Sequence, residues 1–229
     1  MVQTTQQFFD DLVSEYDNVI KRLVSPYPKM LWAMFYYLPK DFKPKKILEL
    51  GCGTGRLTKV LHEQWDNSSI TVVDISAAML EKTKQVVKHK DLQLIESSME
   101  KLCLPKNNYD LVISSLAIHH LTNESKIKLI KNIFNWLNKD GFFILTDCVR
   151  AQSERLYAVN NEHWIQLAKE QGLSEEEMNE QIRHHKTHDY YPVLIDLVNW
   201  MKEAGFLNVD ILWHYCIWVV LQAQKTNNK

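Results

Sequence analysis

Residues 47–57 read Ile-Leu-Glu-Leu-Gly-Cys-Gly-Thr-Gly-Arg-Leu, and they hold three of the six glycines in this 229-residue chain. The apolar residues before Gly51 predict a short buried strand, and the residues after Gly55 have helical spacing. Glycine lets a backbone turn tightly and approach a ligand, and the first N–H groups of a helix are free to bind one. The stretch therefore predicts a strand, a ligand-binding turn and a helix.

The glycine spacing excludes two familiar nucleotide sites. The dinucleotide fingerprint Gly-x-Gly-x-x-Gly needs a glycine where this chain has Arg56, and the P-loop pattern is absent. Asp74 ends the next predicted strand, 23 residues after Gly51. A carboxylate at that position can accept hydrogen bonds from both hydroxyls of a ribose. The turn and the carboxylate together predict a ribose-containing ligand at the carboxyl ends of the strands.

Strands and helices alternate along most of the remaining chain. Strands are expected at 46–50, 70–73, 92–95, 109–114, 142–146, 209–215 and 217–222, and helices at 3–24, 29–38, 57–64, 77–89, 124–137 and 192–204. Ser76 should cap the helix that follows it, and Asp140-Gly141 should form a turn. This alternation predicts an α/β fold with a doubly wound, mostly parallel sheet. The last two strands are so close in sequence that they should pair antiparallel.

The length predicts one domain spanning residues 1–229, because domains typically hold about 150 residues. Two segments elaborate it: an N-terminal helical cap over residues 1–40 and a helical insertion over residues 150–190. The insertion precedes the final helix, so we expect it to cover the carboxyl edge of the sheet.

Composition excludes several classes of protein. The formal charge is −1, which argues against a surface built for nucleic-acid backbones. No signal peptide is evident, and no apolar run reaches the ~20 residues that a membrane helix needs. The four cysteines are far apart and include no Cys-x-x-Cys. We therefore expect a cytoplasmic protein with no membrane partner, as a monomer or homodimer.

Three stretches together resemble the class I S-adenosylmethionine-dependent methyltransferases. They are residues 47–57, Val-Val-Asp-Ile-Ser at 72–76, and Tyr-Asp-Leu-Val-Ile-Ser-Ser-Leu-Ala-Ile-His-His-Leu at 109–121. Their order and spacing match over about residues 40–150. The resemblance implies a Rossmann-like sheet of seven strands with an antiparallel last strand, and S-adenosyl-L-methionine as the cofactor.

The resemblance also implies which residues bind that cofactor. They are Glu49, Gly51, Gly53 and Gly55 at its methionine half, Asp74 at the ribose, Ile75 on the adenine, Ser98 and Met99 at the adenine edge, and Ser114 at the methionine ammonium through its carbonyl. Many relatives carry aspartate in place of Ser98, which here would accept a hydrogen bond from the adenine amino group. Tyr16 matches a Tyr-Asp pair that closes over the cofactor in relatives.

Methyl transfer is an in-line displacement, and a base is needed only where the acceptor carries a proton. His119 and His120 follow the fourth strand, so either could face the methyl group and serve as that base. With Tyr16 they are the predicted catalytic residues. Alternatively, the two histidines cap the turn or pack structurally.

Histidine and aspartate also cluster near the end of the insertion, at His184, His185, His188 and Asp189. Helical spacing puts His184 and His188 on one face, and His185 and Asp189 on another. The neighbouring Arg183 and Lys186 favour a solvated, weakly basic face, and we predict no metal. A metal site and a lid over an acidic substrate are the alternatives.

The main functional hypothesis is methyl transfer to a small-molecule acceptor, since the charge and the compact insertion suit an enclosed substrate. Trp164 and His163 could line the acceptor pocket. A second hypothesis links the chain to RNA, because residues 204–218 loosely resemble enzymes of wobble-uridine carboxymethoxy modification, including carboxy-S-adenosylmethionine synthase. That synthase places an arginine where this chain reads Thr-His-Asp-Tyr-Tyr at 187–191, which favours ordinary S-adenosylmethionine. A non-catalytic cofactor-binding module is the third.

Overall fold

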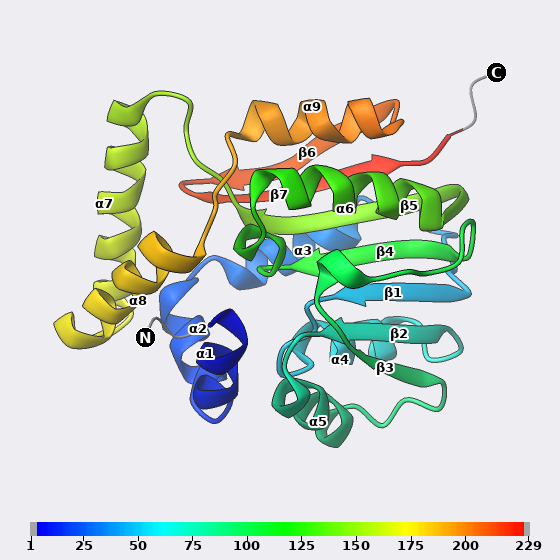
Figure 1. The fold of residues 1–229 in the computed structure, drawn as a ribbon, viewed down its shortest axis with the longest axis horizontal. Helices are drawn as coiled ribbons and strands as arrows, with labels where there is room; N and C mark the ends of the chain where they lie inside the picture. Colours follow the sequence, from blue (N-terminus) through cyan, green and yellow to red (C-terminus); the bar gives the residue numbers. More distant parts are fainter. Residues whose placement is uncertain (1–3, 227–229) are drawn as a thin grey trace.

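The computed structural model describes residues 4–226, which form a seven-stranded sheet in the order β3-β2-β1-β4-β5-β7-β6 (Figure 1). The strands are β1 (Lys46–Leu50), β2 (Ser69–Asp74), β3 (Leu92–Glu96), β4 (Tyr109–Ser115), β5 (Leu137–Cys148), β6 (Asn208–Tyr215) and β7 (Trp218–Gln224). β7 runs antiparallel to both β5 and β6, and the first five strands pair in parallel. The predicted seven-stranded, mostly parallel sheet with an antiparallel last strand is confirmed.

Helices surround the sheet. They are α1 (Thr5–Leu12), α2 (Tyr16–Leu23), α3 (Tyr27–Tyr36), α4 (Arg56–Gln64), α5 (Ala77–Val86), α6 (Asn123–Trp136), α7 (Glu154–Glu170), α8 (Glu175–His188) and α9 (Leu194–Ala204), with short 3₁₀ turns η1 (Met99–Lys101) and η2 (Ile118–His120). Ser76 caps α5 as predicted, since its side chain accepts a hydrogen bond from the Met79 N–H.

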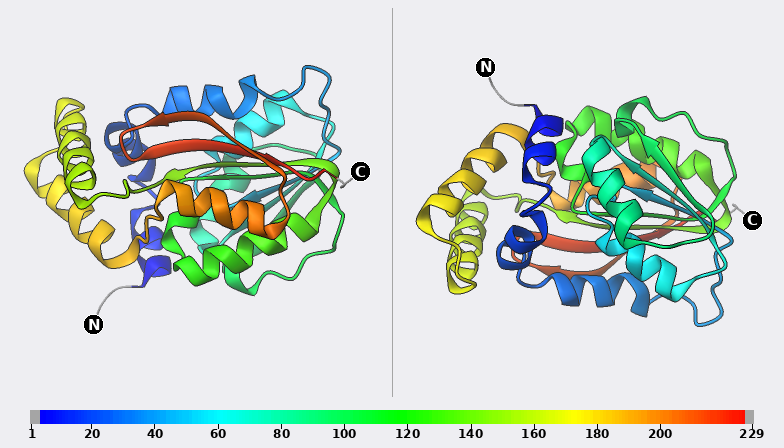
Figure 2. Two further views of the ribbon diagram at one scale, coloured as in Figure 1. Left: turned by 90° about the horizontal axis from the view of Figure 1, so that it is seen from above. Right: turned by 90° about the horizontal axis from the view of Figure 1, so that it is seen from below.

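Alternate residues of each central strand face opposite layers, which makes the strands apolar on both sides. Ile47 of β1 belongs to a core shared with α3 and α4, whereas Leu48 belongs to a second core shared with α6 and α9. Figure 2 shows these helices on the two faces of the sheet. The strand order reverses between β1 and β4, so the loop after β1 lies at the switch point where such sheets bind ligands.

The single helix expected at 3–24 is wrong. It divides into α1 and α2, with a turn over residues 13–15. Thr4 starts α1 with a capping box shared with Gln7. The two halves bury their apolar sides against different partners: Phe8 of α1 stacks on His184, whereas Ile20 of α2 packs on the core.

The turn predicted at Asp140-Gly141 does not separate α6 from β5, because β5 begins at Leu137 and continues through it. Asp140 does adopt a turn-like left-handed conformation, with φ of 63°. The backbone of Lys225 bonds both residues, accepting from the Asp140 N–H and donating to the Gly141 carbonyl. These bonds to the chain after β7 hold the irregular segment in the sheet.

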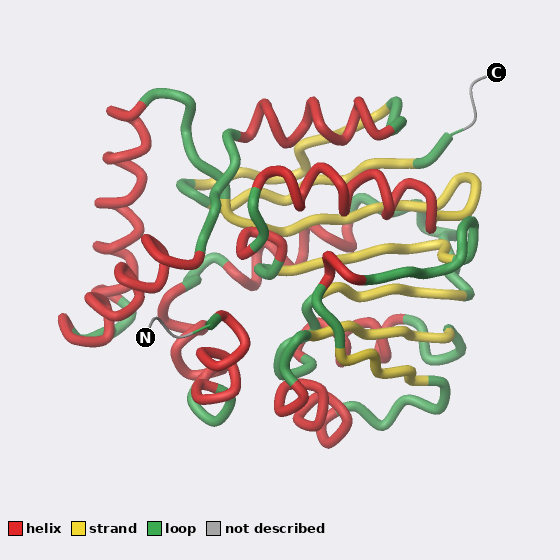
Figure 3. The backbone as a smooth tube through the Cα atoms, in the orientation of Figure 1, coloured by secondary structure: helices red, strands yellow, loops and turns green. Residues whose placement is uncertain are grey.

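The N-terminal helices and the insertion meet beyond the carboxyl ends of the parallel strands (Figure 3). Arg22 of α2 pairs with Glu177 of α8 at 2.6 Å, and the Trp164 indole N–H donates to the Leu23 carbonyl at 3.3 Å. Within residues 4–226, no helix combines the length and apolar character needed to cross a membrane.

Candidate active site

The loop after β1 turns through left-handed conformations at each of its glycines. Gly51, Gly53 and Gly55 have φ of 72°, 52° and 84°. A Cβ added to Gly51 would lie 2.2 Å from the Cβ of Ala117, so the loop also passes very close to the chain after β4. Only glycine satisfies both demands at position 51.

Asp74 fixes this loop from the end of β2. Its carboxylate accepts hydrogen bonds from the Gly53 N–H at 2.8 Å and the Ser76 N–H at 3.0 Å. Burial raises the pKa of this carboxyl, and these backbone donors oppose the rise. A carboxylate oxygen can accept more than one hydrogen bond, so each oxygen of Asp74 retains capacity toward a ligand.

A cavity of about 170 Å³ opens beside Gly51, Gly53 and Asp74, and we call it the glycine cavity. The predicted residues that line it are Tyr16, Gly51, Gly53, Asp74, Ile75, Ser98, Met99 and His120. Met79, Ser97 and Ala117 also line it, although the sequence did not predict them there. The Ser97 N–H donates to the Asp74 carbonyl, so Ser97 lies beside the end of β2. The expected pairing of the strand ends could therefore have predicted Ser97.

Three predicted cofactor residues lie elsewhere. An added Cβ at Gly55 would lie 3.0 Å from Thr83 of α5, so this glycine allows α4 and α5 to pack. The Ser114 hydroxyl donates to the Leu50 carbonyl at 2.8 Å and ties β4 to β1. Glu49 lines a smaller hollow of about 30 Å³ that adjoins the glycine loop, together with Tyr16 and Ser115.

Glu49 is a buried carboxyl whose only hydrogen bond among the described residues comes from Thr58, at 2.7 Å. Burial raises its pKa to about 8, with a smaller contribution from the charge of Asp74. The folded pKa lies above the ordinary value of 4.5, so the unfolded chain loses this proton first as pH rises. Stability is therefore lost between about pH 4.5 and pH 8.

We expect Glu49→Gln to remove this pH dependence in the ligand-free protein. The variant should melt several degrees above the parent chain at pH 8 and close to it at pH 4.5, because the amide cannot ionise. Thermal denaturation across this range measures the effect, with the exposed strand residue Glu96→Gln as control. Equal melting temperatures at pH 8 would contradict the assignment.

A second cavity, of about 70 Å³, lies between the sheet edge and the two helical elaborations, and we call it the histidine cavity. Its walls come from α1, α2, the loop after β4, α7, α8 and the start of β7. Its polar lining groups include His119, His120, His184, His185 and Asp189. Trp164 also lines it, as suggested by the sequence, whereas His163 bonds the Tyr215 hydroxyl instead.

The two cavities are neighbours with a common wall. Phe9, Tyr16, Leu116 and His120 line both of them. The Tyr16 ring stands over the glycine loop, where a Cβ added to Gly53 would be 3.9 Å from it. Burial raises the pKa of Tyr16, so its hydroxyl stays protonated. A ligand in the glycine cavity therefore faces the histidine cavity across a thin partition of side chains.

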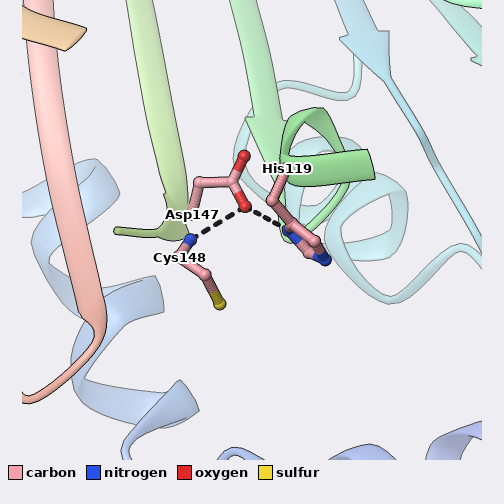
Figure 4. A group of neighbouring side chains, drawn as sticks. All are labelled: His119, Asp147 and Cys148. Carbon is pink, nitrogen blue, oxygen red and sulfur yellow. Dashed lines mark hydrogen bonds and ion pairs between the residues drawn. The ribbon is translucent and has the colours of Figure 1, made fainter. Parts of the chain in front are cut away.

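His119 is held rigidly at the edge of the sheet. Its Nδ1–H donates to the carboxylate of Asp147, which also accepts the Cys148 N–H at 2.9 Å (Figure 4). Burial lowers the pKa of His119, but the carboxylates of Asp147 and Asp189 outweigh burial and raise it. The bond to Asp147 leaves Nε2 as the ring atom available for chemistry.

Asp189 is surrounded by four histidines. Its Oδ1 lies 2.9 Å from His120 Nδ1, 3.7 Å from His184 Nε2 and 3.9 Å from His119 Nε2, and its Oδ2 lies 3.3 Å from His185 Nδ1. Burial raises the pKa of Asp189, but His119 and the other imidazoles outweigh this and hold it well below its usual range.

The solvated face favoured for the end of α8 is wrong for its inward side. The side chains of His184 and His185 are only 9% and 13% exposed. Burial lowers the pKa of His184 to about 4, so this ring is neutral near pH 7. His184 and His188 do share a helix face, with ring centroids 5.0 Å apart.

Asp147 and Lys126 are the two charged residues near this site that the sequence analysis missed. Asp147 lies at the carboxyl end of β5, so the rule that strand ends share one edge could have found it. Lys126 is buried in α6, and its ammonium donates to the carbonyls of Leu121 and Tyr190. No sequence signal distinguishes it from the other lysines of α6.

Comparison with known proteins gives a family match over the central strands. Residues 47–141 match a family model described as a methyltransferase domain. The chain is 34% identical over 120 residues to a malonyl-[acyl-carrier protein] O-methyltransferase of Anoxybacillus flavithermus, covering 52% of this chain and 44% of that protein. It is 24% identical over 220 residues to a carboxy-S-adenosyl-L-methionine synthase of Trichodesmium erythraeum, covering 90% and 83%. The chain thus spans less than half of the first relative and most of the second.

The fold also resembles solved structures. Human N-acetylserotonin methyltransferase in complex with S-adenosylmethionine superposes with a TM-score of 0.60 and 16% identity, over 97% of this chain and 56% of that one. At this identity the likeness concerns the fold.

Proposed function

Because the chain is a class I S-adenosylmethionine-dependent methyltransferase, we propose that it methylates a small-molecule acceptor enclosed in the histidine cavity. The observation that carries this proposal is the common wall between the two cavities. The cofactor would occupy the glycine cavity, and its methyl group would point through the partition formed by Phe9, Tyr16, Leu116 and His120.

The hydrogen-bonding groups of the glycine cavity suit the nucleoside half of the cofactor. The Asp74 carboxylate faces the cavity and would bind the ribose hydroxyls, and Ile75 would pack on the adenine. Ser98 and Met99 would border the adenine edge. Glu49, beneath the glycine loop, would act on the methionine half only after a rearrangement that opens the hollow it lines.

The acceptor we propose carries an ionisable O–H, N–H or S–H group. Methyl transfer then forms the bond from that heteroatom to the methyl carbon and breaks the carbon–sulfonium bond, yielding S-adenosylhomocysteine. The acceptor's proton would leave by way of the polar cluster of His119, His120 and Asp189, of which His120 belongs to the shared wall. Apolar side chains line much of the rest of the cavity and would exclude water from the reacting atoms.

Carboxy-S-adenosylmethionine synthesis is a second candidate, because relatives with that name match about 90% of the chain. The charges favour ordinary S-adenosylmethionine. Among the described residues that line the glycine and histidine cavities there is no lysine or arginine to pair with an added carboxylate. Carboxylated cofactor in the purified protein, detected by mass spectrometry, would overturn this preference.

We also propose the reducing cytoplasm as the compartment. All four cysteines are free, and two of them, Cys52 and Cys148, are buried beside the proposed site.

Asp74→Ala tests the cofactor assignment. We expect S-adenosylmethionine binding to weaken by about 1–3 kcal/mol, or about 5- to 150-fold, because charged hydrogen bonds to the ribose are lost. Isothermal titration calorimetry on the folded variant measures this change.

Asp210→Ala, which removes an exposed carboxylate from the edge strand β6, is the matched control and should bind normally. Unchanged affinity in a folded Asp74→Ala protein would contradict the cofactor site. Cofactor binding without S-adenosylhomocysteine formation across a broad panel of protic acceptors would favour a non-catalytic binding module instead.

A further inference from the structure

The imidazoles around Asp189 come together from separate parts of the chain. His119 and His120 belong to η2 after β4, and His184 belongs to α8, more than 60 residues later. One atom, Asp189 Oδ1, lies within 4 Å of a ring nitrogen from each of these three residues. The side chains of all four residues are at most 13% exposed.

Several polar atoms of this cluster have no hydrogen-bond partner among the described residues. They are Asp189 Oδ1, His120 Nδ1 and His184 Nδ1, all buried. The first two are only 2.9 Å apart, yet their geometry is not that of a hydrogen bond. Leaving such buried atoms unsatisfied destabilises the fold, and an ion bound among them would remove part of that cost.

His119 has the environment of a metal-binding histidine. Its Nδ1–H is held by the Asp147 carboxylate, and that carboxylate is fixed in turn by the Cys148 N–H (Figure 4). In metal sites a carboxylate on one ring nitrogen commonly orients the other nitrogen toward the ion. Here the other nitrogen, Nε2, is the one that faces Asp189.

The distances fit a single ion. One ligand atom from each of His119, His120 and Asp189 lies within 4.8 Å of the other two. Metal–nitrogen and metal–oxygen bonds of about 2.0–2.2 Å place ligand atoms roughly 3–4.4 Å apart, so only small side-chain movements are required. Asp147 and Cys148 form another candidate group with His119, but that Asp147 oxygen already accepts two N–H bonds.

We propose that His119, His120 and Asp189 bind a divalent first-row transition-metal ion in the histidine cavity, with His184 as an adjacent further donor. Two imidazoles and one carboxylate suit Zn²⁺, Fe²⁺ or Co²⁺, whereas Mg²⁺ prefers oxygen ligands. Three protein ligands leave coordination positions open for a substrate.

This site also narrows the substrate class, a step that rests on the proposed methyltransferase function. An acceptor whose hydroxyl or thiol binds the ion would lose its proton to solvent, because a metal lowers the pKa of a coordinated group. The resulting anion would be held beside His120, which also borders the glycine cavity. The acceptor class is therefore one whose own hydroxyl or thiol binds the ion.

Cobalt binding tests the site directly. The purified chain is stripped with a chelator, dialysed and titrated with Co²⁺, whose visible absorption reports nitrogen and oxygen ligation. We expect stoichiometric binding that Zn²⁺ displaces and millimolar Mg²⁺ does not. Asp189→Asn and His120→Gln should weaken it more than about 100-fold, and Asp147→Asn, which only positions His119, about 10- to 100-fold.

His214→Gln is the matched control, because it removes an exposed imidazole on β6 away from the cluster. It should bind Co²⁺ like the parent chain. Failure of the folded parent chain to bind Co²⁺ would overturn the proposal, as would equal binding by the folded Asp189→Asn and His120→Gln variants. Circular dichroism verifies the folding of each sample, and S-adenosylhomocysteine binding is measured separately on the same samples.

The same measurement separates the two proposals. Cofactor binding without Co²⁺ binding would overturn the metal site and leave the methyltransferase proposal standing. Co²⁺ binding without cofactor binding would support the ion and contradict the proposed function.

Discussion

His119→Ala is expected to reduce methyl transfer by about 10²- to 10⁴-fold while cofactor affinity stays within about twofold of the parent chain. His119 lines the histidine cavity and is not among the residues that line the glycine cavity. The substitution therefore removes a group that would act on the acceptor, either directly or as a metal ligand, and leaves the nucleoside contacts intact. Single-turnover assays with calorimetry measure the two quantities on the same sample.

Two further variants test whether the loss of activity is specific to His119. His214→Ala removes an exposed imidazole from β6 and should retain full activity. Asp147→Asn keeps the size of the side chain that orients His119 but weakens its hold on the Nδ1–H, so turnover should fall by a smaller factor. Full activity in His119→Ala would exclude this residue from the chemistry.

Gly51→Ala is expected to destabilise the protein by about 2–6 kcal/mol and to weaken cofactor binding by more than tenfold. The new Cβ would lie 2.2 Å from the Cβ of Ala117, at a residue whose φ is +72°. The strained backbone and the overpacking cost about 1–3 kcal/mol each. Denaturant unfolding and calorimetry measure the two effects.

The chain offers a control that separates strain from clash. Gly172, after α7, has φ of +85° with nothing within 4 Å of an added Cβ, so Gly172→Ala should cost only about 1–2 kcal/mol. The double variant Gly51→Ala with Ala117→Gly removes the closest contact and should recover part of the loss. Equal destabilisation by Gly51→Ala and Gly172→Ala would show that the approach of the two loops does not matter.

Local patterns predicted the fold well. Each correct prediction depended on residues that are close in sequence, so the sequence alone was sufficient. Examples are the apolar run before Gly51, the capping serine at position 76 and the spacing of the later strands. The predictions of secondary structure were wrong where contacts between residues far apart in the sequence determine the local structure. On either side of the turn at residues 13–15, α1 and α2 contact parts of the chain that are distant in sequence, and the irregular start of β5 is held by Lys225, 84 residues beyond Gly141.

The residues on the nucleoside side of the candidate site could be predicted equally well from the sequence, because they lie at the ends of consecutive strands. Gly51 and Ser98 follow β1 and β3, Asp74 ends β2, and parallel strands bring those ends to one edge. Glu49, Gly55 and Ser114 show the limit of this rule. They lie in the same stretches, yet none of the three lines the glycine cavity: Gly55 packs against α5, and the Ser114 hydroxyl is bonded to β1.

The sequence by itself therefore determined the parallel sheet, the position of the glycine turn and the carboxylate that faces it, since strand alternation and backbone freedom are local properties. Only the tertiary structure decided that α8 folds back over η2, so that Asp189 meets His119 and His120 in a cavity enclosed by α1 and α2. The physical reason is that a cluster of buried polar groups depends on which helices pack together. That packing is set by contacts such as the stacking of Phe8 on His184 and the hydrogen bond from the Trp164 indole to the Leu23 carbonyl, which no spacing in the sequence records.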